Sequence, residues 1–291
     1  MKNLLCSCVL AAAVISLSPT APAAESSAGV GPSFKGPIGL QLYSLRAQFS
    51  KDLEGTFKKV QGYGFKEVEL ASTYNLPAEK FNQLLKDHGL TAISGHFPYE
   101  RYRDEPEKVA KEAKALGLKY AGCAWITHAG DFDEKECRDA IAVFNRAGEA
   151  LKKEGIKFFY HVHGYEFQPF GRATLFDLLM AETKPELVSY QMDVFWVVFP
   201  NQDPVKLLQK YGARWELMHV KDMKKGLKTG SLSGGTDVSN DVAIGTGQMN
   251  WPAILSEAAK QGVKYYFIED ESPTSETQIP QSLRYLESVK W

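Results

Sequence analysis

The sequence predicts a closed barrel of eight parallel β-strands surrounded by α-helices, the (β/α)₈ or TIM barrel. From residue 37 onward, short apolar runs alternate with longer amphipathic segments, and a glycine repeatedly stands between a helical segment and the next apolar run. Alternation of this kind is typical of a parallel sheet built from strand–helix–strand units. Eight such units are the number that a closed barrel requires.

The individual elements follow from periodicity. The expected strands are residues 38–43, 67–70, 91–96, 120–124, 157–161, 188–193, 215–220 and 265–269. The expected helices lie near residues 52–63, 77–88, 105–116, 134–154, 172–182, 203–211, 251–262 and 276–290. The glycines that end helices in a left-handed conformation are Gly64, Gly89, Gly117, Gly155, Gly212 and Gly262.

Composition favours a single large catalytic domain over residues 37–291. The chain has 291 residues, of which 44% are hydrophobic and 24% charged, so there is enough apolar material for a substantial core. Basic and acidic residues number 34 and 35, which leaves no broad basic field for nucleic acid. We therefore expect a small-molecule substrate and no nucleic-acid partner, while the oligomeric state is not readable from the sequence.

The amino terminus has the pattern of a secretory signal peptide over residues 1–24. Lys2 precedes an apolar run over residues 4–17 and then small residues suited to cleavage. A membrane anchor would need a longer apolar run, and a lipoprotein attached through Cys6 or Cys8 would have too short an apolar core before the cysteine. We expect an exported protein, periplasmic in a Gram-negative bacterium, that has no membrane contact after cleavage.

Three further expectations concern segments outside the strand ends. Residues 25–36 are small and glycine-rich, as in a flexible lead-in. Cys123 lies in an apolar run and Cys137 in a polar helical one, so a buried thiol and a surface thiol are favoured over a disulfide. The long connection over residues 221–248 follows the seventh strand and is expected to be a lid or wall of the substrate site, with an inert insertion as the alternative.

Polar residues gather where the strands end, which is the face where TIM barrels carry their active sites. They are Glu69, His96, His161, His163, Asp193, His219, Lys221, Asp222, Glu269, Asp270 and Glu271. Four of the six histidines are among them.

Strands five to eight end in a mixed set of nitrogen and oxygen ligands: His161, Asp193, His219 and Glu269. This set suits one divalent cation, Mn²⁺, Co²⁺, Zn²⁺ or Mg²⁺. Taken singly, His219 could be an ordinary buried histidine and Asp193 a helix cap.

An ordered set of phrases resembles the sugar isomerase/epimerase superfamily of xylose-isomerase-like TIM barrels. The phrases are IGLQLYS (38–44), FKEVEL (65–70), MD (192–193), HVKD (219–222), GTGQMNW (245–251) and FIEDE (267–271). The resemblance covers residues 38 to about 290 and implies one metal held by strands five to eight, with Asp193, His219 and Glu269 as ligands.

Strand five departs from the family pattern. Many relatives have a glutamate there in a LENH phrase, whereas this chain has His161 at that position, followed by His163 and Glu166 as alternative ligands. A Tyr-His-x-His phrase resembles the 2-keto-myo-inositol dehydratase branch, in which enolisation beside a ketone is coupled to loss of water. Trp196 replaces a substrate-binding histidine of many sugar epimerases, so that Trp196, like Trp125, could stack on a sugar ring or simply pack.

These observations predict a metal-dependent enzyme that enolises an unphosphorylated sugar or keto-sugar beside its carbonyl, giving isomerisation or epimerisation. Glu269 is the expected base, and Lys221 or His163 handles the second proton. The expected substrate contacts are His96, Glu69, Trp125, Glu166 and Trp196.

A hydratase or dehydratase using the same enolate is the main alternative, and a non-enzymatic sugar-binding protein is a remote one. A DNA-repair endonuclease on the same barrel would need three metals and a basic face, neither of which is visible.

Overall fold

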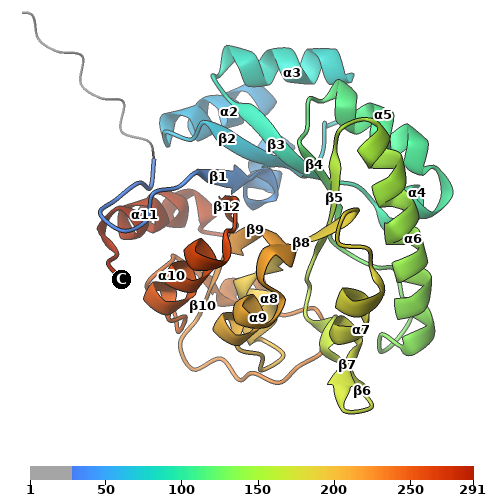
Figure 1. Cartoon of the computed structure of the whole chain (residues 1–291). Coiled ribbons are helices and arrows are strands. Elements are labelled where there is room, and N and C mark those ends of the chain that lie inside the picture. The colour runs from blue at the N-terminus through green and yellow to red at the C-terminus, as the bar shows by residue number, and fades with distance from the viewer. Residues whose placement is uncertain (1–27) are drawn as a thin grey trace, which may run out of the picture.

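The computed structural model describes residues 28–291, and these form a closed barrel of eight parallel strands (Figure 1). In spatial order the strands run β1-β12-β9-β8-β5-β4-β3-β2, and the barrel closes where β1 pairs in parallel with β12. The barrel strands are β1 (Ile38–Gln41), β2 (Glu67–Leu70), β3 (Thr91–His96), β4 (Tyr120–Cys123), β5 (Lys157–His161), β8 (Val188–Asp193), β9 (Trp215–Val220) and β12 (Tyr265–Ile268). The predicted fold class is confirmed.

One long helix follows each barrel strand and covers its outer face. These helices are α2 (Leu53–Gly62), α3 (Ala78–Asp87), α5 (Pro106–Ala115), α6 (Glu134–Lys153), α7 (Leu175–Glu182), α9 (Pro204–Tyr211), α10 (Trp251–Gln261) and α11 (Ser275–Ser288). The six glycines expected to end helices all have positive φ angles, between 49° and 90°. At the start of α6, the side chain of Asp133 accepts from the backbone N–H of Glu136 while Glu136 bonds back to Asp133, which satisfies two free helix donors.

Short elements that the sequence did not predict lie mainly in the connections at the carboxyl ends of the strands. The helical ones are η1 (Leu42–Leu45), α1 (Arg46–Phe49), α4 (Tyr99–Asp104), η2 (Tyr165–Phe167), α8 (Val194–Val198), η3 (Gly212–Arg214) and η4 (Val238–Asn240). Two small antiparallel ribbons pair β6 (Pro169–Phe170) with β7 (Ala173–Thr174) and β10 (Asp222–Met223) with β11 (Asp241–Val242). The second ribbon folds the long connection back over the barrel mouth.

The structure changes two expectations about the periphery. The described part of the lead-in, residues 28–36, packs against the body of the protein: Phe34 is buried, and the backbone N–H of Gly29 donates to Glu287 on α11. Cys137 was expected at the surface but is buried on the inner face of α6, where its Sγ contacts the carbonyl of Leu175. The sequence prediction was wrong there because the polar residues around Cys137 lie on the other face of the helix.

Both described cysteines, Cys123 and Cys137, are free thiols. The predicted signal peptide lies outside the described residues. Within residues 28–291, none of the helices combines the length and apolar character needed to cross a bilayer.

The barrel interior holds an apolar layer beneath the polar strand ends. Ile93, Tyr120, Phe159, Leu217 and Phe267 form a buried cluster separate from the larger one between barrel and helices. Two glycines make room for its rings: a Cβ on Gly122 would lie 2.4 Å from the Phe159 ring, and one on Gly39 would lie 2.7 Å from the Phe267 ring. Because strand residues two apart share a face, this layer supports His161, His219 and Glu269 directly above it.

We expect Gly122→Ala to lower the free energy of unfolding by about 1–3 kcal/mol, because an added methyl group would overpack the Phe159 ring. Urea unfolding monitored by circular dichroism measures this change. The matched control is Gly62→Ala in α2, where nothing lies within 4 Å of the added Cβ. That substitution should leave stability unchanged or raise it by up to about 1 kcal/mol. Equal stability of the two variants would contradict the close approach of Phe159 to β4.

Candidate functional site

Two hollows lie at opposite ends of the barrel. The one at the amino ends of the strands, about 720 Å³, is lined by lysines and Glu216, and Lys157, Lys264 and Tyr120 all bond to that glutamate. The charge of Glu216 is therefore already paired with Lys157 and Lys264 at the base of the barrel. The hollow at the carboxyl ends, about 400 Å³, contains the polar strand ends and is the candidate site.

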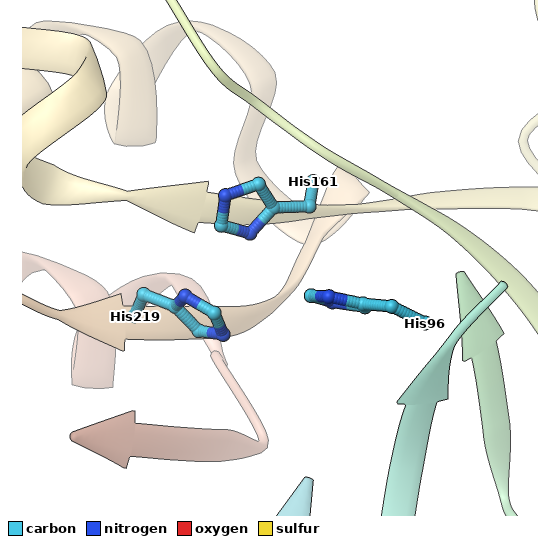
Figure 2. A group of neighbouring side chains, drawn as sticks. All are labelled: His96, His161 and His219. Atoms are coloured by element: carbon cyan, nitrogen blue, oxygen red, sulfur yellow. The ribbon is translucent and has the colours of Figure 1, made fainter. Parts of the chain in front are cut away.

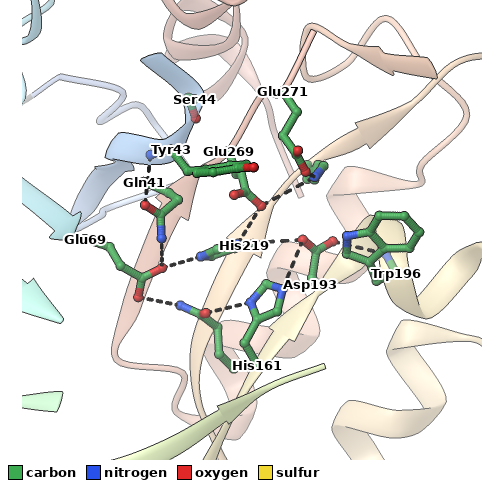
Figure 3. Close-up of polar contacts among 12 residues, drawn as sticks. Gln41, Tyr43, Ser44, Glu69, His161, Asp193, Trp196, His219, Glu269 and Glu271 are labelled. Atoms are coloured by element: carbon green, nitrogen blue, oxygen red, sulfur yellow. Dashed lines mark hydrogen bonds and ion pairs between the residues drawn. The ribbon is translucent and has the colours of Figure 1, made fainter. Parts of the chain in front are cut away.

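The candidate site is built on adjacent strands whose register brings its side chains together. His161 on β5 pairs with Gln191 on β8, and Asp193, two residues further along β8, pairs with His219 on β9. Glu269 directly follows β12, the other neighbour of β9. All of these side chains are buried. Figure 3 shows them converging at the strand ends.

Glu69 lies beneath this cluster rather than against the cavity. Its carboxylate accepts from Gln41 Nε2 at 2.7 Å, Ser94 Oγ at 2.6 Å, Gln191 Nε2 at 2.9 Å and His219 Nε2 at 2.5 Å. Burial alone would raise the pKa of Glu69, but the neighbouring histidines and hydrogen bonds lower it to about 2. Glu69 is thus a permanently charged acceptor that orients other side chains.

The carboxylate of Glu69 fixes the orientation of the hydrogen bonds made by His161 and His219. An ionised carboxylate only accepts hydrogen bonds, so Gln191 must direct its NH₂ group to Glu69 and its Oε1 to His161 Nδ1, 2.8 Å away. His161 therefore donates from Nδ1 and keeps a lone pair on Nε2. Burial and the nearby charge of His219 lower the pKa of His161 to about 3, so this ring is neutral. His219 donates from Nε2 to Glu69, and its Nδ1 lies 3.0 Å from Glu269 Oε2. Burial would lower the pKa of His219, but the carboxylates of Glu269 and Glu69 raise it well above its usual value, so a cation bound at Nδ1 would displace a proton.

Two carboxylate oxygens and two imidazole nitrogens lie close together at this end of the barrel and could bind a cation. Asp193 Oδ2 is buried without a hydrogen-bond partner, 3.8 Å from His161 Nε2 and 3.6 Å from His219 Nδ1. Glu269 Oε2 lies 3.0 Å from His219 Nδ1. Ligand atoms of Asp193, His219 and Glu269 all lie within 4.8 Å of one another. The orphaned oxygen of Asp193, two imidazole nitrogens and one oxygen of Glu269 together fit a divalent cation.

A second group of three histidines is less suited to a metal. His96, His161 and His219 also bring ligand atoms within 4.8 Å, and Figure 2 shows their rings gathered together. One nitrogen of each ring is already occupied, however: His96 Nε2 and His161 Nδ1 by Gln191 Oε1, and His219 Nε2 by Glu69. The nitrogens left on His161 and His219 face Asp193 instead.

Lys221 is the buried positive charge beside the cluster. Its Nζ lies 2.6 Å from Glu271, 3.4 Å from Glu269 and 3.5 Å from Asp241. Burial would lower the pKa of Lys221, but these carboxylates outweigh burial and raise it well above the usual value. Asp241 reaches this position from the long connection because Met223 on β10 pairs with it. Lys221 is therefore held as an ammonium group at the edge of the cavity.

The remaining predicted residues fall into two groups. His96, His163, Trp125 and Trp196 line the cavity, and His163 stacks on Trp196 with ring centroids 4.6 Å apart. Glu166 does not line it. Its carboxylate accepts from the backbone N–H groups of His163 and Gly164 and from the Tyr160 hydroxyl, so it stabilises the turn after β5.

The long connection forms one wall of the cavity, through Gly234, Gly235, Thr236, Val238 and Asp241. Asp222 anchors it rather than facing the cavity. Its carboxylate accepts from the N–H groups of Gly245, Gly247 and Met249 and from the indole of Trp251. One side chain thus organises the whole GTGQMNW phrase.

Sequence reasoning did not identify Gln41, Gln191, Tyr43 or Asp241. Gln191 carries a usable signal, since it lies two residues before Asp193 on a buried strand and so shares its face. Gln41 is likewise a polar residue ending a buried strand. Asp241 has no such signal because it lies in a loop without periodicity.

A family model described as "Xylose isomerase-like TIM barrel" matches residues 57–289. The chain belongs to this family. Among solved structures, a sugar phosphate isomerase/epimerase from Parabacteroides distasonis is 24% identical with a TM-score of 0.74, covering 92% of this chain and 98% of that one. A zinc-bound IOLI protein is 12% identical with a TM-score of 0.67, covering 86% and 94% of the two chains, and supports the fold alone.

Among curated relatives, the inosose dehydratase of Clostridium tetani is 34% identical over 95 residues. The match covers 32% of this chain and 31% of that enzyme. The chain thus aligns with about a third of that relative's length. The proteins that this chain resembles thus include one named as an isomerase/epimerase and one named as a dehydratase.

We expect Gln191→Leu to weaken Zn²⁺ binding by about 10–100-fold, because His161 loses the acceptor that fixes its protonated nitrogen. Calorimetry measures the affinity. In the metal-free wild type, ¹⁵N NMR of the histidine rings should show His161 protonated at Nδ1, a signature that the variant should lose. Gln209→Leu on α9 is the control and should change neither result. Unchanged affinity and ring shifts in Gln191→Leu would contradict the orienting role of Gln191.

Proposed function

We propose that this chain is a divalent-metal-dependent enzyme that enolises an unphosphorylated sugar or keto-sugar beside its carbonyl, leading to isomerisation or epimerisation. The observation that carries the proposal is the buried, unpartnered Asp193 Oδ2, faced by His161 Nε2, His219 Nδ1 and Glu269. A buried charged oxygen without a partner is costly, and a cation is the natural partner for this donor set. Zn²⁺, Mn²⁺, Co²⁺ and Mg²⁺ all suit these nitrogen and oxygen ligands.

Charge around the cavity favours a substrate without a phosphate group. No lysine or arginine is among the described residues that line it, whereas Asp241, Glu269 and Glu271 are. Lys221 lies behind them with its charge engaged by these same carboxylates. A phosphate dianion would therefore find no lysine or arginine among the described lining residues to bind it. Export through the expected signal peptide, also a proposal, would agree with an unphosphorylated substrate.

The residues around the cluster can perform the proton transfers. When bound, a divalent cation would polarise the substrate carbonyl and stabilise negative charge that develops on its oxygen. Glu269 is the carboxylate placed to take the proton from the neighbouring carbon. Lys221, kept protonated by its carboxylates, is a donor rather than a base. Neutral His163, whose buried Nδ1 has no partner, can bind or move a proton at a substrate hydroxyl.

Hydration or dehydration of a keto-sugar is the second candidate, and the identity of His161 favours it. Epimerisation with two carboxylate bases needs one on each face of the substrate, but β5 supplies a neutral imidazole that is engaged by Gln191 and faces Asp193. Loss or gain of water needs only one base together with an acid at the hydroxyl, the roles open to Glu269 and Lys221. The inosose dehydratase relatives agree with this alternative.

We expect Asp193→Asn to abolish metal uptake while keeping the fold. Asp193 Oδ1 accepts the N-cap hydrogen bond from Trp196, which an asparagine oxygen can keep, but the amide NH₂ would replace the free Oδ2. Metal content by mass spectrometry and a thermal melt measure both effects. Asp87→Asn, at an exposed position on α3, is the control. Full metal content in Asp193→Asn would refute the proposed centre.

Proton NMR in D₂O with unphosphorylated sugars and 3-keto-sugars tests the reaction. We expect deuterium to enter beside the carbonyl, and Glu269→Gln to slow this entry by at least about 100-fold, since it removes the base. A new sugar isomer supports isomerisation or epimerisation, whereas gain or loss of water supports the second candidate. A metal-loaded protein that exchanges no proton with any of these sugars would refute enolisation.

A further inference from the structure

Three exposed apolar side chains surround the mouth of the candidate cavity. Within residues 28–291 only five large apolar side chains are exposed: Val30, Tyr43, Trp125, Val238 and Trp291. Tyr43, Trp125 and Val238 are 42%, 41% and 37% exposed, and all three line this one cavity. They come from connections far apart in the sequence, after β1, after β4 and within the long connection, so their meeting is a property of the fold.

Both aromatic rings at the mouth are held in place although they remain exposed. The guanidinium of Arg46 lies 4.3 Å from the centre of the Tyr43 ring, and Arg46 also donates to the carbonyls of Tyr43 and Glu271. Trp125 stacks on His128 with centroids 5.1 Å apart and meets the Tyr165 ring edge-on at 4.8 Å. Rings fixed in this way lose little conformational entropy when a ligand covers them.

The approach of the long connection to Trp125 depends on a glycine. Gly234 has a φ of +64°, and a Cβ there would lie 2.7 Å from the Tyr165 ring and 3.1 Å from Trp125. This close approach places the wall of the cavity beside the indole without covering it.

The cavity therefore changes character from its inner end to its mouth. The inner end has His161, Glu269 and the buried Asp193 beneath it, which suit a carbonyl and hydroxyls. The mouth offers aromatic and aliphatic surface that a polar free sugar would leave exposed to water. Its volume of about 400 Å³ equals about thirteen water-sized volumes at ~30 Å³ each, so a sugar ring can fill the inner end with room left over.

We propose that the substrate is a keto-glycoside: a ketone on its sugar ring supplies the carbonyl at the inner end, and its apolar aglycone, preferably an aromatic ring, lies against Trp125 and Tyr43. This inference rests on the proposed function, because it takes the inner end to hold the reacting sugar. An aglycone attached to that sugar is the occupant that fits, since the apolar surface opens directly into the polar cavity. A flat ring can cover Trp125 and gain stacking in addition to apolar burial.

Phenyl and methyl β-D-glucopyranoside, with their α anomers, are probes that differ only in the aglycone. We expect the wild type to bind one phenyl glucoside on the order of tenfold more tightly than its methyl partner, as one aromatic contact of about 1.4 kcal/mol would give. Saturation-transfer NMR titrations can read such weak affinities and should show the strongest transfer to the phenyl protons.

Trp125→Ala and Tyr43→Ala should each reduce the phenyl preference by several-fold and leave methyl glucoside binding nearly unchanged. Trp291→Ala is the matched control, because Trp291 is 40% exposed but does not line the cavity. Tyr43→Ala keeps the test valid if loss of Trp125 disturbs the packing around Tyr165. No phenyl preference in the wild type, or a preference that both variants retain, overturns the aglycone inference.

The two proposals fail in different ways. A phenyl preference that depends on Trp125 and Tyr43, in a protein that takes up no metal and exchanges no deuterium, supports the aglycone site and removes the proposed enolisation. Deuterium exchange into free sugars without any phenyl preference supports the proposed enolisation and removes the aglycone site.

Discussion

The structure of the candidate site depends on one buried negative charge, the carboxylate of Glu69. An ion taken out of water is tolerated only when its hydrogen-bonding capacity is filled. Here residues from β1, β3, β8 and β9 all direct donors at it. The requirement to satisfy this charge ties strands from opposite sides of the barrel together. It also explains why glutamine and serine occupy interior positions where a TIM barrel would otherwise place Val, Ile or Leu.

The same charge connects the packing of the barrel to the chemistry proposed for it. Because Glu69 accepts and never donates, the direction of each hydrogen bond in the chain Glu69–Gln191–His161 is fixed. The outcome is that His161 Nε2 keeps a lone pair that faces Asp193. The apolar layer fills the barrel directly below the histidines and so limits how deeply they can lie. Its rings Phe159 and Phe267 pack against Gly122 and Gly39. The apolar layer therefore sets the position of the histidines, and the hydrogen bonds to Glu69 and Gln191 set their protonation.

The fold could be predicted from sequence because its signals are local and repeated. Strand runs recur in every unit and helix-ending glycines in six of the eight, and the bounds of the long elements agree within a few residues. The site could be predicted only in part. His161, Asp193, His219 and Glu269 end barrel strands, and strand ends converge in any such barrel. Glu69 lies near the end of β2 and Glu166 in the turn after β5, yet the carboxylates of both accept from protein donors instead of facing the cavity. Asp241 depends on the path of a loop with no periodic pattern.

The anchoring of the long connection by Asp222 has a consequence for how this barrel can diversify. One carboxylate binds the backbone at Gly245, Gly247 and Met249 and the indole of Trp251 immediately after β9, so the two ends of the loop are fastened to each other. What lies between them can change in length and composition without altering the distance between β9 and α10. Replacement of this segment, with Asp241 kept because it contacts Lys221 and Glu271, would alter the mouth of the cavity while the interior of the barrel stays as it is.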